Sequence, residues 1–219
     1  FNFISDKNLT LINSFNAKYN DILISAGSLS LKKDKQIDIN GQFKSQFDLR
    51  ENGINKLFSR PNLFFLEKNK VNIKGSLLNN FTLKINENFK LVDYDYKSRG
   101  NISESQIIFK DDFNSNIIKT PIKKFSISNT NLEINLNKRE NNLLMFDGLY
   151  SLGKSENKKF KISHDLKKIS PKYFIDFDLA KNISLELLNF ESNRRNESNI
   201  KSEIILKNNN IFFKYIKFS

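Results

Sequence analysis

The stretch from Val71 to Leu91, VNIKGSLLNNFTLKINENFKL, decides the fold of this chain. Its apolar residues fall almost entirely on odd positions, and asparagine, lysine, serine and threonine occupy most of the even ones. The odd apolar residues are Val71, Ile73, Leu77, Phe81, Leu83, Ile85, Phe89 and Leu91. Successive side chains of an extended strand point to opposite faces, so this spacing predicts β-structure with one apolar and one wetted face.

The same spacing recurs outside this stretch. The run from Ile37 to Leu49 places Ile37, Ile39, Phe43, Phe47 and Leu49 on one parity. Shorter sets are Phe1/Phe3, Leu9/Leu11, Ile22/Ile24, Leu29/Leu31, Phe125/Ile127, Leu132/Ile134/Leu136, Phe160/Ile162, Tyr173/Ile175/Phe177/Leu179, Ile204/Leu206 and Ile211/Phe213/Tyr215. The pattern predicts an all-β chain of about a dozen strands in a long, highly twisted, mostly antiparallel meander sheet.

Breaks in the alternation predict where the chain turns or bulges. The parity changes near 129–131 and again at 93–95, and both are bulge or turn candidates. Turn-forming residues gather at 26–28, 32–35, 98–101, 138–142, 153–159, 193–198 and 208–210. At most one or two short helices are expected: Ile54, Leu57 and Phe58 fit one helical turn before Pro61, and 182–188 is ambiguous.

Composition narrows the classes of function. The 219 residues include no cysteine and one histidine, which excludes disulfide frameworks, thiolate chemistry and a histidine pair for zinc. The net charge of +12 reflects many lysines, but asparagine, lysine and isoleucine are all enriched as in an A/T-rich genome. Phenylalanine and lysine occupy opposite parities, so no exposed basic stacking surface for nucleic acid is expected.

No linker rich in glycine, serine or proline divides the chain, so residues 1–219 are expected to form one β-domain. The chain begins at Phe1 rather than at methionine, and we expect it to be a segment of a longer protein. No apolar run approaches the ~20 residues of a membrane-spanning helix.

Two groups of residues are candidates for catalysis. His164 lies between Ser163 and Asp165, but neighbours on a strand point to opposite faces and cannot converge, so a solvated turn histidine is expected. Asp176 and Asp178 are expected on one strand face about 7 Å apart, a spacing that simple alternation also produces. The sequence therefore predicts a protein that is not an enzyme, with no catalytic residue, no metal site and no cofactor.

An extended sheet with one apolar face needs something to cover that face. The uninterrupted alternation of apolar and polar residues over 37–49, 71–91 and 173–185 resembles that of the AsmA-like envelope proteins of Gram-negative bacteria. These proteins are related in architecture to bridge-like lipid-transfer proteins. The resemblance implies a sheet curled into an open, taco-like groove. It also implies a periplasmic segment of a chain anchored in the inner membrane, which shields phospholipid acyl chains on their way to the outer membrane.

The expected partner is therefore a phospholipid or another acyl lipid, and nucleic acid is not an expected partner. The residues expected to line the groove are Ile37, Ile39, Phe43, Phe47, Val71, Ile73, Leu77, Phe81, Leu83, Ile85, Phe89, Leu91, Phe125, Ile127, Leu132, Ile134, Leu136, Ile175, Phe177 and Leu179. Two alternatives stay open at this point. One is a closed β-sandwich or β-helix that serves as a binding or scaffold module of a secreted or surface protein. The other is a carbohydrate-active β-enzyme, which the absence of tryptophan disfavours.

Overall fold

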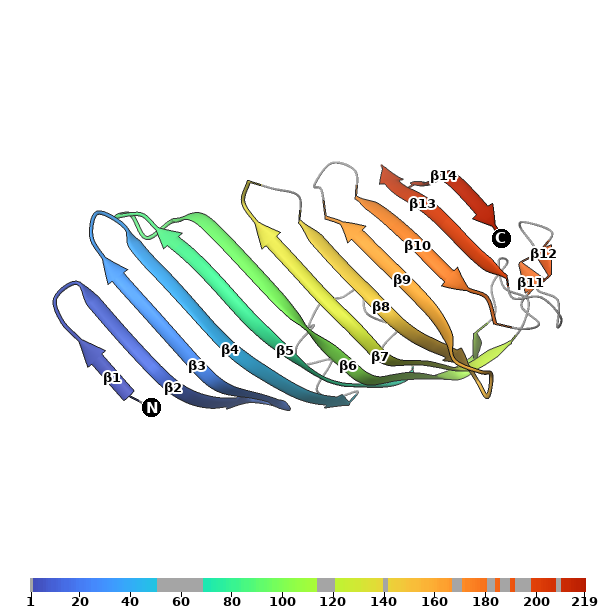
Figure 1. The fold of residues 1–219 in the computed structure, drawn as a ribbon, viewed down its shortest axis with the longest axis horizontal. Helices are drawn as coiled ribbons and strands as arrows, with labels where there is room; N and C mark the ends of the chain where they lie inside the picture. Colours follow the sequence, from blue (N-terminus) through green and yellow to red (C-terminus); the bar gives the residue numbers. More distant parts are fainter. Residues whose placement is uncertain are drawn as a thin grey trace.

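The computed structural model describes residues 2–50, 69–113, 121–139, 142–166, 171–180, 184–185, 190–191, 198–207 and 210–219. Twelve strands form one open antiparallel sheet in the order β1-β2-β3-β4-β5-β6-β7-β8-β9-β10-β13-β14 (Figure 1). They are β1 (Asn2–Ser5), β2 (Leu9–Tyr19), β3 (Ile22–Lys33), β4 (Ile37–Arg50), β5 (Lys70–Ile85), β6 (Leu91–Phe113), β7 (Ile122–Asn137), β8 (Leu143–Leu152), β9 (Lys158–Asp165), β10 (Lys172–Asp178), β13 (Asn199–Lys207) and β14 (Asn210–Phe218). A separate two-stranded sheet contains β11 (Ser184–Leu185) and β12 (Phe190–Glu191).

The predicted fold class is confirmed. Each strand of the large sheet pairs with the next strand of that sheet along the chain, which is the pattern of a meander, with β11 and β12 intervening between β10 and β13. Because all twelve strands belong to one sheet, the alternative of a closed two-sheet sandwich does not describe these residues.

The long run Val71–Leu91 is two strands rather than one. Strand β5 ends at Ile85, a turn spans 86–90, and β6 begins at Leu91. The side chain of Asn86 caps the turn by accepting hydrogen bonds from the backbone N–H groups of Asn88 and Lys90. The parity continues through the turn by coincidence, and Phe89 lies in it with a φ of 55° and 81% exposure. The prediction that Phe89 lines the apolar face is therefore wrong.

Two predicted turns lie inside strands. Residues 98–101 fall in the middle of β6 and keep their pairing with both β5 and β7. Residues 26–28 form a bulge in β3, where the register to β4 shifts between Ser25 and Ser28. The predicted break at 129–131 is confirmed as a bulge, since the register of β7 against β8 shifts between Ser128 and Asn131. The predicted helical turn at Ile54, Leu57 and Phe58 lies outside the described residues, as does most of 182–188.

A line of irregular positions crosses the middle of the strands, and we call it the crease. Ser14, Ala26 and Asn129 lie at mid-strand register shifts and have φ values of 57°, 51° and 45°. Such bulges bend and twist a sheet locally. Two glycines contribute to the bend. A Cβ on Gly41 would lie 2.5 Å from the ring of Phe81, its partner across the ladder, and a Cβ on Gly100 would collide with the backbone oxygen of Ser76.

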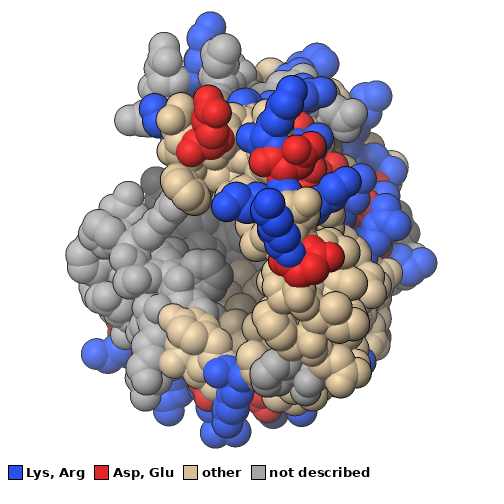
Figure 2. Space-filling view, turned by 90° about the vertical axis from the view of Figure 1, so that its left-hand side faces the viewer, with Lys and Arg blue, Asp and Glu red and all other residues tan. Residues whose placement is uncertain are grey.

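The crease turns the sheet into a trough. Seen end-on, the molecule is hollowed, and lysine and arginine side chains gather around its periphery (Figure 2). We call the half of the trough that lies toward the β5–β6 turn the upper half, as it is drawn in Figure 1, and the opposite half the lower half.

Burial differs between the two halves. The buried apolar side chains of the described residues all lie at or below the crease: Leu49, Val71, Ile102, Ile122, Tyr150, Phe160, Leu179 and Ala180. Leu49 and Val71 form a small core with Ile22, Phe47, Ile73 and Ile107 packed against them. The packed core of the trough therefore lies in its lower half.

Candidate functional site: the inner face of the trough

Strand register places the predicted lining residues on one face, which we call the inner face. Directly opposed residues of an antiparallel ladder point to the same side, so faces can be followed from strand to strand. Ile39 pairs with Leu83, and Leu83 pairs with Tyr94. Eighteen of the twenty predicted residues share this face. The exceptions are Phe89, which lies in the turn at 86–90, and Leu179, which follows the end of β10 and is buried.

The same register places on the inner face further residues that are not among the predicted lining residues. Tyr94 and Tyr96 pair with Leu83 and Phe81, and so lie on the inner face. Leu144 and Phe146 pair with Ile134 and Leu132. They belong to the run Leu143–Phe146, in which odd and even positions are both apolar. Alternation alone therefore cannot assign these residues to the inner or the outer face. Their assignment depends on the register across the bulge at Asn129.

The lower half of the inner face holds a cluster of aromatic rings. Tyr150 contacts Phe177 and Phe160 edge-on, with ring centroids 5.3 and 6.2 Å apart. Phe125 stacks on Tyr150 at 6.1 Å. The Tyr150 hydroxyl donates a 2.8 Å hydrogen bond to the backbone oxygen of Asp178. Burial raises the pKa of Tyr150 to about 12. The aromatic rings in this part of the face pack against one another, and the hydroxyl of Tyr150 has its own hydrogen-bond partner. This part of the face is therefore a packed core.

Polar residues interrupt the inner face near the crease, and they satisfy one another. The Asn79 amide is 2% exposed and donates to Ser45 Oγ at 3.1 Å. Its oxygen accepts hydrogen bonds from Tyr96 and Ser98 at 2.8 and 2.9 Å. A buried amide with its donors and acceptor paired fixes the strand register and leaves nothing for a ligand.

The upper half of the inner face is apolar and only half-buried. A row of side chains crosses it from β3 to β14, and we call this row the upper strip. Its members are Leu31, Ile39, Leu83, Tyr94, Leu136, Ile134, Leu144, His164, Tyr173, Ile204 and, at the more exposed β14 edge, Phe213. Neighbouring strands lie about 4.8 Å apart, so the upper strip is on the order of 40 Å long. The upper strip is a continuous, largely apolar row whose side chains remain partly exposed to solvent.

His164 belongs to the upper strip, and the prediction of a solvated turn histidine is wrong. It shares the parity of Phe160 and Ile162, and its ring stacks on Tyr173 with centroids 3.9 Å apart at 16°. Its Nε2 atom is buried and has no hydrogen-bond partner among the described residues. Burial lowers the pKa of His164, against the opposing charge of Asp165. Ser163 and Asp165 take the opposite parity, so the three side chains do not form a catalytic group.

Asp176 and Asp178 share the outer face, as the alternation predicts. The Asn199 amide donates to both carboxylates, at 2.7 and 2.9 Å. Lys201 pairs with Asp176 at 2.9 Å. Burial would raise the pKa of Asp176, but the hydrogen bonds from Asn199 and Lys201 outweigh it and lower that pKa. The two carboxylates therefore serve a cross-strand ladder that links β10 to β13.

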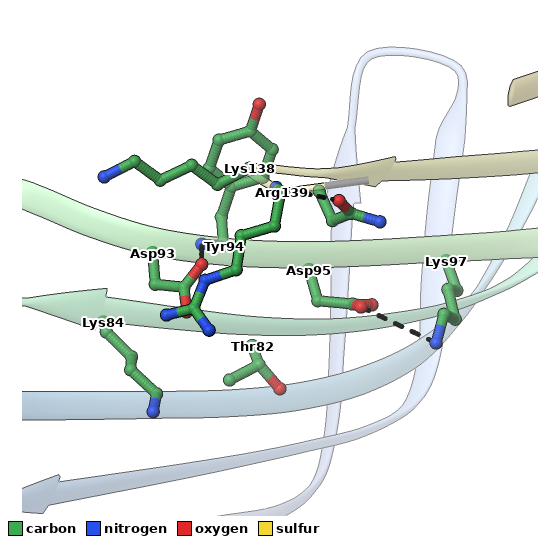
Figure 3. Close-up of a pocket in the computed structure, with 9 residues that line it drawn as sticks. Thr82, Lys84, Asp93, Tyr94, Asp95, Lys97, Lys138 and Arg139 are labelled. Carbon is green, nitrogen blue, oxygen red and sulfur yellow. Dashed lines mark hydrogen bonds and ion pairs between the residues drawn. The ribbon is translucent and has the colours of Figure 1, made fainter. Parts of the chain in front are cut away.

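A depression on the outer face of β5, β6 and β7 is lined by polar and charged residues (Figure 3). Arg139 pairs with Asp93 at 3.4 Å and Lys97 with Asp95 at 3.6 Å. The Lys138 ammonium donates to the backbone oxygen of Val92. These charges are largely engaged with one another. Among the described residues, no group of three or more histidine, aspartate or glutamate side chains is placed to hold a metal ion.

Comparison with protein-family models, curated protein sequences and solved structures finds no match to this chain. No helix in the part of the chain that the structure describes is long and apolar enough to cross a membrane.

Proposed function

We propose that the trough shields the acyl chains of a phospholipid while the lipid passes between membranes. The observation that carries this proposal is the upper strip: a half-exposed apolar row that crosses ten strands of an open sheet. A lipid tail costs about 0.8 kcal/mol per methylene when it leaves the membrane for water. A continuous apolar surface lowers that cost at every position along its length.

The chemistry of the two faces supports this function. Leucine, isoleucine and aromatic rings make non-directional contacts, so an acyl chain can slide along them without breaking specific bonds. The outer face is mostly asparagine, lysine and serine, which keeps the trough in contact with water. The core below the crease holds the shape of the trough without help from a ligand.

The resemblance to AsmA-like proteins supports a wider setting. In that setting the chain is a periplasmic segment of an envelope protein that is anchored in the inner membrane and helps to build the outer membrane. Its role there is passive, with no reaction catalysed and no cofactor needed. The lipid species and the direction of transfer follow from what the rest of such a protein contacts.

Two neighbouring substitutions test the proposal. We expect the purified chain to carry phospholipid and to take up a fluorescent acyl probe. Leu83 lies on the upper strip, so Leu83→Lys places an ammonium in the acyl track, where it can be hydrated from the open side. The variant should stay folded and lose several-fold in bound lipid. Thr82 lies on the outer face, where its hydroxyl contacts Asn40 at 2.9 Å, and Thr82→Lys should retain both properties.

Circular dichroism, thermal melts and mass spectrometry of extracted lipid separate the outcomes. A folded, lipid-poor Leu83→Lys supports the groove. An unfolded Leu83→Lys means that the upper strip is a closed core. Lipid-free wild-type protein that takes up no probe contradicts the proposal outright.

A further inference from the structure

The outer face changes character at one end of the sheet. On β1 to β9 it carries mostly polar residues, but on the upper part of β10, β13 and β14 it carries Phe174, Ile205, Phe212 and Tyr215. Ile205 pairs with Phe212, while Phe174 and Tyr215 flank Glu203 from either side. We call these four apolar residues the outer patch.

The outer patch is exposed. Phe174, Phe212 and Tyr215 are 40%, 52% and 37% exposed. Of the other large apolar side chains exposed on the outer face of the described residues, Leu23 and Leu78 have polar partners across the ladder, whereas Ile4 pairs with Leu11 at the opposite edge of the sheet. Single exposed apolar residues are ordinary on protein surfaces, whereas three exposed aromatic side chains at one corner of a face mark a contact surface.

Lysines surround the outer patch. Glu203 is 4% exposed, and its carboxylate is held by Lys214 at 3.0 Å and Lys172 at 3.9 Å. Lys217 lies over the Tyr215 ring at 5.5 Å, and Lys207 is exposed at the upper end of β13. Two lysines on one carboxylate, with two more beside them, leave this corner positively charged.

Alternation alone hides the outer patch. Tyr215 has the parity of Phe213, so the sequence places both on the inner face. A register shift between Glu203 and Ile204 adds one residue to β14 and turns Tyr215 outward. At this corner, therefore, aromatic residues and lysines share the outer face, whereas the aromatic rings of the lower cluster, around Tyr150, lie on the inner face.

We propose that the outer patch docks the trough on the surface of an anionic bilayer. Aromatic side chains with neighbouring lysines suit the boundary between headgroups and acyl chains, where the rings enter the boundary and the ammonium groups meet phosphate. Ile205 among the rings favours hydrocarbon over stacked bases. Docking depends on the outer face alone and stands whether or not the inner face carries lipid.

Vesicle flotation tests this proposal with the 219-residue chain. The probes are vesicles of phosphatidylcholine alone and of phosphatidylcholine mixed with phosphatidylglycerol. We expect binding to the anionic vesicles that weakens with salt. The double variant Phe174→Ser/Phe212→Ser should lower that affinity at least tenfold. Its matched control is Leu23→Ser/Leu78→Ser, which removes two exposed apolar side chains from the same face outside the patch and should bind like wild type.

A charge pair refines the test. The double variant Lys207→Gln/Lys217→Gln removes two ammonium groups that do not pair with Glu203. The loss of each ammonium group should lower the affinity for anionic vesicles about fivefold. Lys18→Gln/Lys44→Gln makes the same change in net charge on the outer face of β2 and β4 and should have a smaller effect. Leu83→Lys should dock normally, which separates docking from lipid carriage.

Three results would overturn the docking proposal. The first is wild-type protein that fails to float with anionic vesicles. The second is equal loss of binding in the patch variant and its matched control, either for the two apolar double variants or for the two lysine double variants, which would mean that the association does not depend on the outer patch. The third is tighter, patch-dependent binding to a single-stranded oligonucleotide than to vesicles, which would make the patch a stacking surface for bases.

Discussion

The lower and upper halves of the inner face are both largely apolar but differ in burial. Below the crease, Leu49 and Val71 are 7% and 5% exposed and pack with their neighbours into a core. Above it, Ile39 and Leu83 lie on the same strand pair and remain half-buried. The alternation of apolar residues therefore predicts which face of the sheet a residue lies on. It does not predict whether the residue is buried in a core or lines an open groove.

Side-chain size and placement explain much of the difference. The rings of Tyr150, Phe160 and Phe177, on the neighbouring strands β8, β9 and β10, pack against one another below the crease. The upper strip is richer in leucine and isoleucine, which reach less far from the sheet. Close packing below and open surface above give a trough that keeps its shape and still has apolar surface to offer.

A matched pair of leucines should show the largest contrast. Leu49→Ala empties part of the lower core and should cost about 2–5 kcal/mol of unfolding free energy. Leu83→Ala removes the same atoms from a half-exposed position and should cost about 1 kcal/mol. Urea denaturation followed by circular dichroism measures both. Equal losses would mean that the two halves are packed alike, and the distinction between core and lining would fail.

The sequence predicted the sheet and most of its inner face because the alternation is local. Eighteen of twenty predicted lining residues lie on one face, since each is fixed by a parity that its own strand carries. The errors occur where one extra residue changes the parity or a turn preserves it. Phe89 sits in a turn that keeps the odd spacing, and Tyr215 follows a bulge that reverses it.

The alternation does not predict burial, because burial depends on strands that are distant in the sequence. Tyr150 is buried by Phe160 and Phe177, which belong to β9 and β10. Asn79 and Ser98 occupy apolar positions because they satisfy each other across a ladder. His164 was assigned to a turn although its spacing from Ile162 already indicated the inner face. That signal was present in the sequence and was misinterpreted.

A medium effect is expected at Tyr150, in the lower half. Tyr150→Phe removes the hydrogen bond to Asp178 and should cost about 1 kcal/mol near neutral pH. The folded-state pKa of about 12 lies above the ordinary value of 10.0, so folding favours the protonated phenol. That contribution is complete below pH 10 and is lost as the pH rises toward 12.

The gap between wild type and Tyr150→Phe should therefore shrink by about 2 kcal/mol from pH 9 to pH 12, and the variant should become the more stable. Urea melts over this range measure the gap. A gap that stays constant would show that the hydroxyl ionises as it does in the unfolded chain, and the lower half would then be wet.

The smallest effect is expected at His164, in the upper half, and it joins stability to the proposed function. The folded-state pKa lies below the ordinary 6.5, so the neutral ring contributes stability above that pH, and the contribution is lost as the pH falls below it. His164→Phe keeps a ring against Tyr173 and should flatten this acid dependence. The chain contains one histidine, so a single imidazole signal in an NMR titration reports this position. An acyl probe in the upper strip would displace water from the ring and lower its pKa further. A titration at the ordinary pKa that the probe leaves unchanged would mean that the track does not pass His164, and the upper strip would then end before β9.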